Sequence, residues 1–109
     1  MAGGLARFMP GTPKTVPAVF ALGQNHPNPF NPKTTIRFSL PDAGQARLFV
    51  FDVNGRQVAT LIDEHLEAGE HTVDWHGRDD AGVRVSSGVY FYRLDAPDHT
   101  QTRKMLLLQ

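Results

Sequence analysis

The chain has 109 residues, close to the commonest size of a single domain. Lys and Arg together number 11, as do Asp and Glu, so no net field draws the chain to nucleic acid or anionic lipid. The chain contains no cysteine, which excludes disulfides, thiolate metal sites and cysteine nucleophiles.

The first residues show no periodic pattern and predict a linker or tag remnant. Residues 1–17 hold three prolines and three glycines and lack the apolar core of a signal peptide. If the protein is exported, we expect its export signal to lie upstream of this chain. No apolar run approaches the roughly 20 residues needed to span a bilayer. We assign residues 1–21 to the linker and residues 22–109 to one domain, with residues 19–22 as a candidate short first strand.

Residues 25–32 carry three prolines within six positions, interleaved with asparagines. Proline fixes φ, lacks an N–H donor and pushes the preceding residue towards extended conformations. Asparagine side chains can satisfy nearby backbone groups. The segment therefore predicts a rigid, non-helical corner, with Phe30 as its one large anchor.

From Thr34 onwards the hydrophobic pattern has period two, which is typical of half-buried strands. Asn54-Gly55 is the strongest local hairpin signal in the chain. Further strands are expected over residues 34–40, 46–51, 58–62, 71–75, 89–94 and 100–108, with a short extended piece over 83–85. Short strands at this spacing predict an all-β fold, an immunoglobulin-like antiparallel β-sandwich of about seven strands with Greek-key connections.

Two aromatic residues are predicted to serve packing. Trp75 lies on an expected inward face, where one large ring can bridge the two sheets. Tyr90 begins a late strand just after Ser87-Gly88, a position that suits a tyrosine corner with the hydroxyl bonded to backbone.

The sequence offers little for catalysis or metal binding. The five histidines fall in different turns and strands and match no zinc signature. Asp79-Asp80, with Asp74 nearby, forms a good turn sequence and lacks the spacing of an EF-hand loop. No serine elbow or glycine-rich phosphate loop is present. We therefore predict no catalytic residue, no cofactor and no metal site.

Phe49 and Phe91 are expected on the face opposite the core, where polar residues are usual. Exposed aromatic side chains among polar neighbours can form a binding patch. These two residues are therefore the candidate surface patch. Sugar-binding modules also use aromatic side chains in this way, so a carbohydrate-binding accessory module of an extracellular glycoside hydrolase is the alternative function.

The residues also match a family. The segment from Pro27 to Ile36 resembles the Pro-Asn-Pro-Phe-Asn-Pro-x-Thr-x-Ile opening of the C-terminal sorting domains of the type IX (Por) secretion system. Further matching blocks follow in the expected order and end at the C-terminus: residues 52–58, 69–75, 77–82, 87–94 and 104–108. The block after Trp75 is shared with the Ig-like domain of the flagellar hook-capping protein, a related sandwich.

The resemblance implies a non-catalytic C-terminal module that directs secretion and attaches a larger extracellular protein to the surface of a Bacteroidetes-type bacterium. The parent protein would be an enzyme such as a glycoside hydrolase or protease. The implied partners are the type IX outer-membrane translocon, the sorting machinery and the cell envelope, and we expect a secreted, surface-associated monomer. Carried over by motif, the residues recognised by the translocon are Pro27, Pro29, Gly88, Tyr90 and Lys104.

The resemblance also suggests a test and a third function. An exposed terminal edge strand offers unpaired backbone to a partner. We expect deletion of residues 104–109 to abolish sorting while the fold survives. A hook-cap type assembly domain is the third possibility.

Overall fold

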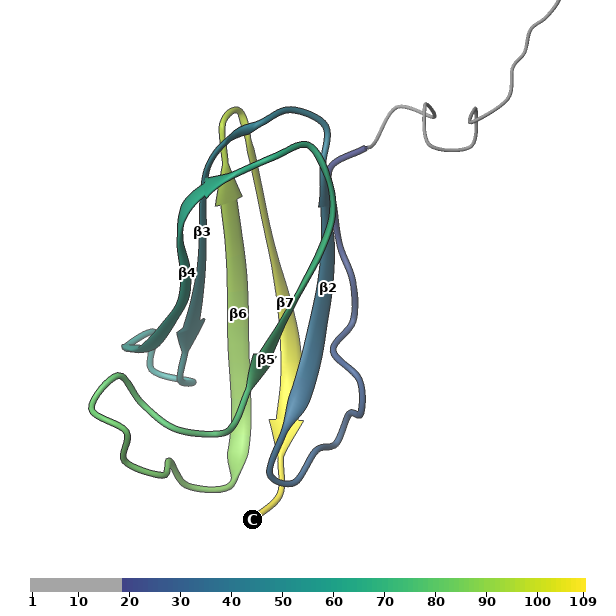
Figure 1. The fold of residues 1–109 in the computed structure, drawn as a ribbon. Coiled ribbons are helices and arrows are strands. Elements are labelled where there is room, and N and C mark those ends of the chain that lie inside the picture. The colour runs from purple at the N-terminus through teal and green to yellow at the C-terminus, as the bar shows by residue number, and fades with distance from the viewer. Residues whose placement is uncertain (1–18) are drawn as a thin grey trace, which may run out of the picture.

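A computed structural model describes residues 19–109 as two antiparallel sheets packed face to face (Figure 1). The strands are β1 (Ala21–Leu22), β2 (Thr34–Leu40), β3 (Gly44–Phe51), β4 (Gln57–Leu66), β5 (Gly69–Trp75), β6 (Gly88–Ala96) and β7 (His99–Leu107). This confirms the predicted all-β sandwich of seven strands. The predicted linker lies largely outside the described residues, and the domain boundary at residue 22 stays a prediction.

One sheet has the order β1-β2-β5 and the other has the order β4-β3-β6-β7. The hairpins β3–β4 and β6–β7 stay within the larger sheet, whereas the connections β2–β3, β4–β5 and β5–β6 cross between the sheets. Non-consecutive strands therefore pair, β2 with β5 and β3 with β6, as Greek-key connections require. None of the described residues forms a helix long and apolar enough to cross a membrane.

The core follows from the period-two pattern of the strands. In β2 the residues Ile36, Phe38 and Leu40 are at most 2% exposed and alternate with outward polar residues. In β3 the buried residues are Ala46, Leu48 and Val50, so Phe49 faces outwards, as expected, and Phe51 lies on the same face. Burying each large aliphatic or aromatic side chain is worth about 1.5–3 kcal/mol, so these alternating rows supply the main stabilisation.

The C-terminal strand contributes to this core. Met105 is 1% exposed and Leu107 is 0% exposed, and both pair with β6. Deletion of residues 104–109 would remove two core side chains and one end of the sheet. This packing predicts that the deletion destabilises the fold, contrary to the expectation from the sequence, so point variants are the better test of the function of this strand.

The hairpin at Asn54-Gly55 is present, with a three-residue loop. The Asp52 amide donates to the Arg56 carbonyl at 3.0 Å, and the Gly55 amide donates to the Asp52 carbonyl at 3.0 Å. Gly55 has φ +82°, the left-handed conformation that closes such loops. Asp52 Oδ1 also accepts the amides of Asn54 and Arg56 at 2.9 and 3.0 Å. The following strand runs to Leu66, four residues beyond the predicted end.

Candidate functional site

The proline-rich segment lies along the outer edge of the C-terminal strand. The Phe30 amide donates to the Leu106 carbonyl at 3.0 Å, and the Leu108 amide donates to the Phe30 carbonyl at 3.0 Å. The Leu106 amide donates to Asn28 Oδ1 at 2.9 Å. Phe30 thereby forms a parallel bridge to Leu107. The two ends of the family motif, residues 27–36 and 104–108, are therefore one composite surface.

The Phe30 side chain anchors this surface in the core. It is 2% exposed, and its ring lies 5.7 Å from the Trp75 ring. Trp75 is 3% exposed and meets Tyr90 edge-on at 5.4 Å. The Trp75 Nε1 group donates to the Arg78 carbonyl at 2.8 Å, so the indole has its polar partner. The predicted packing role of Trp75 is confirmed.

A buried polar network holds the start of the proline-rich segment. The Asn25 amide donates to the Tyr92 hydroxyl at 2.9 Å, and that hydroxyl donates to the Gly23 carbonyl at 2.7 Å. Asn25 Nδ2 donates to Thr34 Oγ1 at 3.0 Å. Thr34 Oγ1 in turn donates to the Pro27 carbonyl at 2.8 Å. The backbone of Pro27 is therefore fixed, while the rings of Pro27 and Pro29 are exposed.

Gly88 and Tyr90 lie at the same end of the sandwich. Gly88 has φ +152° and pairs with Leu107. Tyr90 is 6% exposed, and its hydroxyl donates to the Ser86 carbonyl at 2.6 Å. This is the bond expected of a tyrosine corner. The Tyr90 side chain therefore serves the core, and its place among the recognition residues stays a prediction.

Lys104 presents its side chain on the outer face of β7, opposite Phe91 in register. Among the described residues, Lys104 takes part in no ion pair. Its carbonyl accepts a hydrogen bond from Gln24 Nε2 at 2.9 Å. With the bonds at Leu106 and Leu108, this means that the terminal edge is partly covered. The expected exposed edge strand is thus closed over its last part by the chain's own residues.

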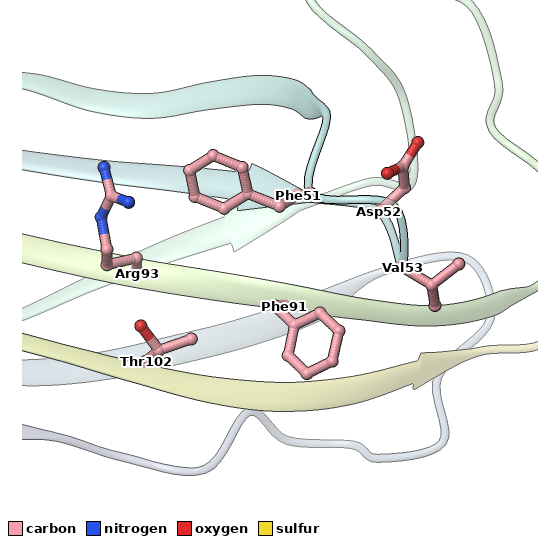
Figure 2. A pocket seen from close by; sticks show the side chains of 7 residues that line it. Phe51, Asp52, Val53, Phe91, Arg93 and Thr102 are labelled. Atoms are coloured by element: carbon pink, nitrogen blue, oxygen red, sulfur yellow. The ribbon is translucent and has the colours of Figure 1, made fainter.

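Phe49 and Phe91 lie on one outer face, as the sequence predicts, together with Phe51. A hollow of about 300 Å³ opens there, lined by Phe51, Asp52, Val53, Gly55, Phe91, Arg93 and Thr102. Figure 2 shows the Phe51 and Phe91 side chains on neighbouring strands, with Arg93 beside Phe51. The Arg93 guanidinium lies 4.9 Å from the Phe51 ring centroid and 5.5 Å from that of Phe49. Phe51 also belongs to this patch, although we did not predict it. The period-two alternation of β3 places Phe51 on the same face as Phe49 and could have identified it.

The carboxylates of the acidic turn, Asp79 and Asp80, accept hydrogen bonds from backbone amides. Asp79 Oδ1 accepts the amides of Ala81 and Val83, each at 2.9 Å. Asp80 Oδ1 accepts the Thr60 amide at 2.9 Å. The interpretation of this segment as a structural turn is confirmed. Over residues 19–109, no three His, Cys, Asp or Glu side chains gather in a group that can hold a metal ion.

Solved structures that share the fold include the following three. PorU from Porphyromonas gingivalis, described as dimeric and latent, superposes with a TM-score of 0.66 at 20% identity, over 85% of this chain and 10% of that chain. PorZ from the same organism is described as an essential surface component of the type IX secretion system. It gives a TM-score of 0.51 at 19% identity, over 83% of this chain and 11% of that chain.

The third is FlgD from Xanthomonas campestris, described in connection with hook capping, which is essential for flagellar assembly. It gives a TM-score of 0.55 at 22% identity, over 82% of this chain and 65% of that chain. The chain thus spans about a tenth of PorU and PorZ and less than two thirds of FlgD. A comparison with curated protein sequences gave no match.

The sequence profile of the FlgD Ig-like domain matches residues 29–99, more than half of the chain. The match runs from the proline-rich segment to His99, the first residue of β7. The chain belongs to the FlgD Ig-like domain family.

Proposed function

We propose that the chain is a non-catalytic sorting module that directs a larger protein through the type IX secretion system and attaches it to the cell surface. The observation that carries the proposal is the pairing of Phe30 with Leu106 and Leu108. It joins the proline-rich opening and the terminal strand, the two motif ends that resemble sorting domains, into one surface. The fold likeness to PorU and PorZ supports the same reading.

The composite surface offers a partner several fixed groups at one end of the sandwich. Pro27 and Pro29 project from a segment whose backbone is hydrogen-bonded on both sides. Lys104 adds a cation that no carboxylate of the described residues neutralises. Preorganised groups lose little entropy when a partner binds, so a rigid surface of this kind favours recognition. The partners on this proposal are the outer-membrane translocon and its sorting machinery.

A secretion assay tests the proposal. The 109-residue chain is fused behind a signal peptide and a fluorescent protein and expressed in a bacterium with a working type IX system. We expect fluorescence at the cell surface or in the medium, and its loss in a strain without the translocon. A wild-type fusion that stays in the periplasm would show that the sorting function is wrong.

Two point variants then test the surface. Lys104→Glu reverses the free charge, whereas Thr102→Glu is a matched control on the same outer face of β7. Both side chains are exposed, so both variants keep the core. We expect the first to accumulate in the periplasm and the second to be exported. Equal export of both would remove Lys104 from the recognition site.

The alternative is a carbohydrate-binding accessory module, and the hollow beside Phe91 favours it. Arg93 weakens it, because its guanidinium covers the Phe49 and Phe51 rings that a sugar would stack on. A polysaccharide pull-down with the wild type and Phe91→Ala separates the two functions. Binding that is lost in Phe91→Ala, with no secretion of the fusion, would favour the alternative.

A hook-cap type assembly domain is the third candidate, supported by the family match and by the likeness to FlgD. If the chain is a hook-cap type domain, we expect genes beside its coding sequence to encode flagellar proteins. Neighbouring genes for envelope or extracellular enzymes would favour the sorting function.

A further inference from the structure

The outer edge of β5 is open. β5 is the last strand of the three-stranded sheet and pairs only with β2. In β2, the amide and carbonyl of Thr35 bind His26, and the Arg37 carbonyl accepts the Gly23 amide at 2.8 Å. These β2 residues therefore turn their backbone groups towards β1 and away from β5.

The register between β2 and β5 then identifies which backbone amides and carbonyls of β5 face the open edge. In an antiparallel pair, residues directly opposite each other either exchange both hydrogen bonds or both point their backbone groups away. Three residues of β5 lie opposite β2 positions that point away, and so turn their amides and carbonyls to the open edge: Glu70, Thr72 and Asp74. Among the described residues, these edge-facing amides and carbonyls form no hydrogen bond with another backbone group.

A row of apolar side chains near this edge is incompletely covered. The smaller sheet has three strands and faces a sheet of four. β1 contacts β7 on one side of the sandwich and β5 contacts β4 on the other, so the three-stranded sheet ends at β5 on the side where β4 ends the four-stranded sheet. The side chains that pack on the core but stay partly exposed include Leu61 and Leu66 of β4 and Val73 of β5. A strand added to β5 would cover this row.

The charges at the β5 edge favour a partner segment with basic side chains over a second copy of this chain. The exposed carboxylates of Glu70 and Asp74 flank Thr72. If a second copy paired antiparallel about Thr72, Glu70 of each copy would lie opposite Asp74 of the other, and like charges directly opposite are destabilising. The cations near this face belong to the β2 side: Lys33 lies 3.8 Å from Asp74, and Arg37 lies opposite Thr72. The charged side chains that β5 itself places on this outer face are the carboxylates of Glu70 and Asp74, of which Asp74 also accepts a hydrogen bond from Thr35 Oγ1 at 2.7 Å.

We propose that the β5 edge binds an extended segment of a partner protein by strand addition. The segment carries Lys or Arg opposite Glu70 and Asp74 and apolar side chains on the face that covers Leu61 and Val73. Backbone hydrogen bonds supply affinity in this mode of binding, and alternate side chains supply specificity. The site lies on the opposite edge of the sandwich from β7, so it does not depend on the sorting function.

Two blocked peptides test the site. The probe is Thr-Lys-Val-Thr-Val-Lys-Thr, which places its lysines opposite the two carboxylates when its central threonine faces Thr72. The control replaces both lysines with glutamate. We expect saturable binding of the lysine peptide in amide NMR titrations, with slowed hydrogen exchange at Glu70, Thr72 and Asp74. The glutamate peptide should bind at least about tenfold more weakly.

Variants make the test specific. Thr72→Pro removes an edge N–H without breaking the β2 ladder, because proline is tolerated where the amide faces solvent. We expect it to abolish peptide binding. Thr102→Pro makes the same change on the outer edge of β7 and should leave binding intact. Changing both Glu70 and Asp74 to lysine should transfer the preference to the glutamate peptide.

Three outcomes would overturn the proposal. The first is the absence of binding by the lysine peptide. The second is binding that survives Thr72→Pro or ignores the charge reversal, because the peptide would then lie elsewhere. The third is a wild-type dimer in sedimentation that protects the amides of Glu70, Thr72 and Asp74, because the occupant of the edge would then be a second copy.

Discussion

Phe30 and Leu106 are 76 positions apart in the chain, yet the amide of the first donates to the carbonyl of the second at 3.0 Å. The Phe30 ring also contacts the Trp75 ring, with the two centroids 5.7 Å apart. One residue thus ties the proline-rich opening both to the terminal strand and to the core. Changes at Phe30 should therefore alter stability and the terminal edge together.

Phe30→Ala should lower the free energy of unfolding by about 3–5 kcal/mol, because it empties a fully buried aromatic site. Chemical denaturation measures the loss. Hydrogen exchange at the amides of Leu106 and Leu108 should also become faster, because the anchor of their partners is gone. Val53→Ala, which truncates a side chain that is 65% exposed, is the control and should change little. Unchanged exchange in Phe30→Ala would show that the backbone pairing holds without the ring.

The two core tyrosines should respond differently to loss of the hydroxyl. The Tyr92 hydroxyl satisfies the amide of Asn25, a residue that is 2% exposed, whereas the Tyr90 hydroxyl binds the carbonyl of the exposed Ser86. Tyr92→Phe leaves a buried donor unpaired and should cost about 1–3 kcal/mol. Tyr90→Phe leaves a group that water can reach and should cost about 1 kcal/mol or less. Equal losses in denaturant titrations would contradict this order.

Tyr92 should also make stability depend on alkaline pH. Burial raises the pKa of Tyr92 above its ordinary value of 10.0, and the Asn25 amide and Arg103 only partly oppose this. Because the folded state holds the phenol proton more tightly than the unfolded state, the stabilisation is complete below the ordinary pKa. It is lost as the pH rises towards the raised pKa.

Unfolding titrations of the wild type and Tyr92→Phe at about pH 8 and about pH 11 test this linkage. The wild type should lose more stability over that interval than the variant, so the difference between the two proteins should shrink at the higher pH. A difference that stays constant with pH would show that Tyr92 does not titrate with folding.

Strands, alternation and packing residues were predictable because they depend on neighbours in sequence. The period of two in β2 and β3 gave the inward rows, and the residues around Gly88 gave the Tyr90 corner. The covering of the terminal edge was not predictable, because it depends on Asn28 and Leu106, which lie 78 positions apart. The open edge of β5 was missed for a related reason. Which backbone groups stay unpaired depends on the sheet order and register, which no local pattern specifies.

The Asp79 turn should contribute to stability without a metal ion. Its carboxylate holds the amides of Ala81 and Val83, so Asp79→Ala should cost about 1–2 kcal/mol in chemical denaturation. Asp42→Ala is the matched control, since it removes the same charge from another exposed turn and should change little. Because the Asp79 oxygen that accepts these bonds is occupied by backbone, the melting temperature of the wild type should be the same with millimolar calcium as with a chelator. A rise with calcium that Asp79→Ala abolishes would assign a cation to this loop and contradict the structural reading of the turn.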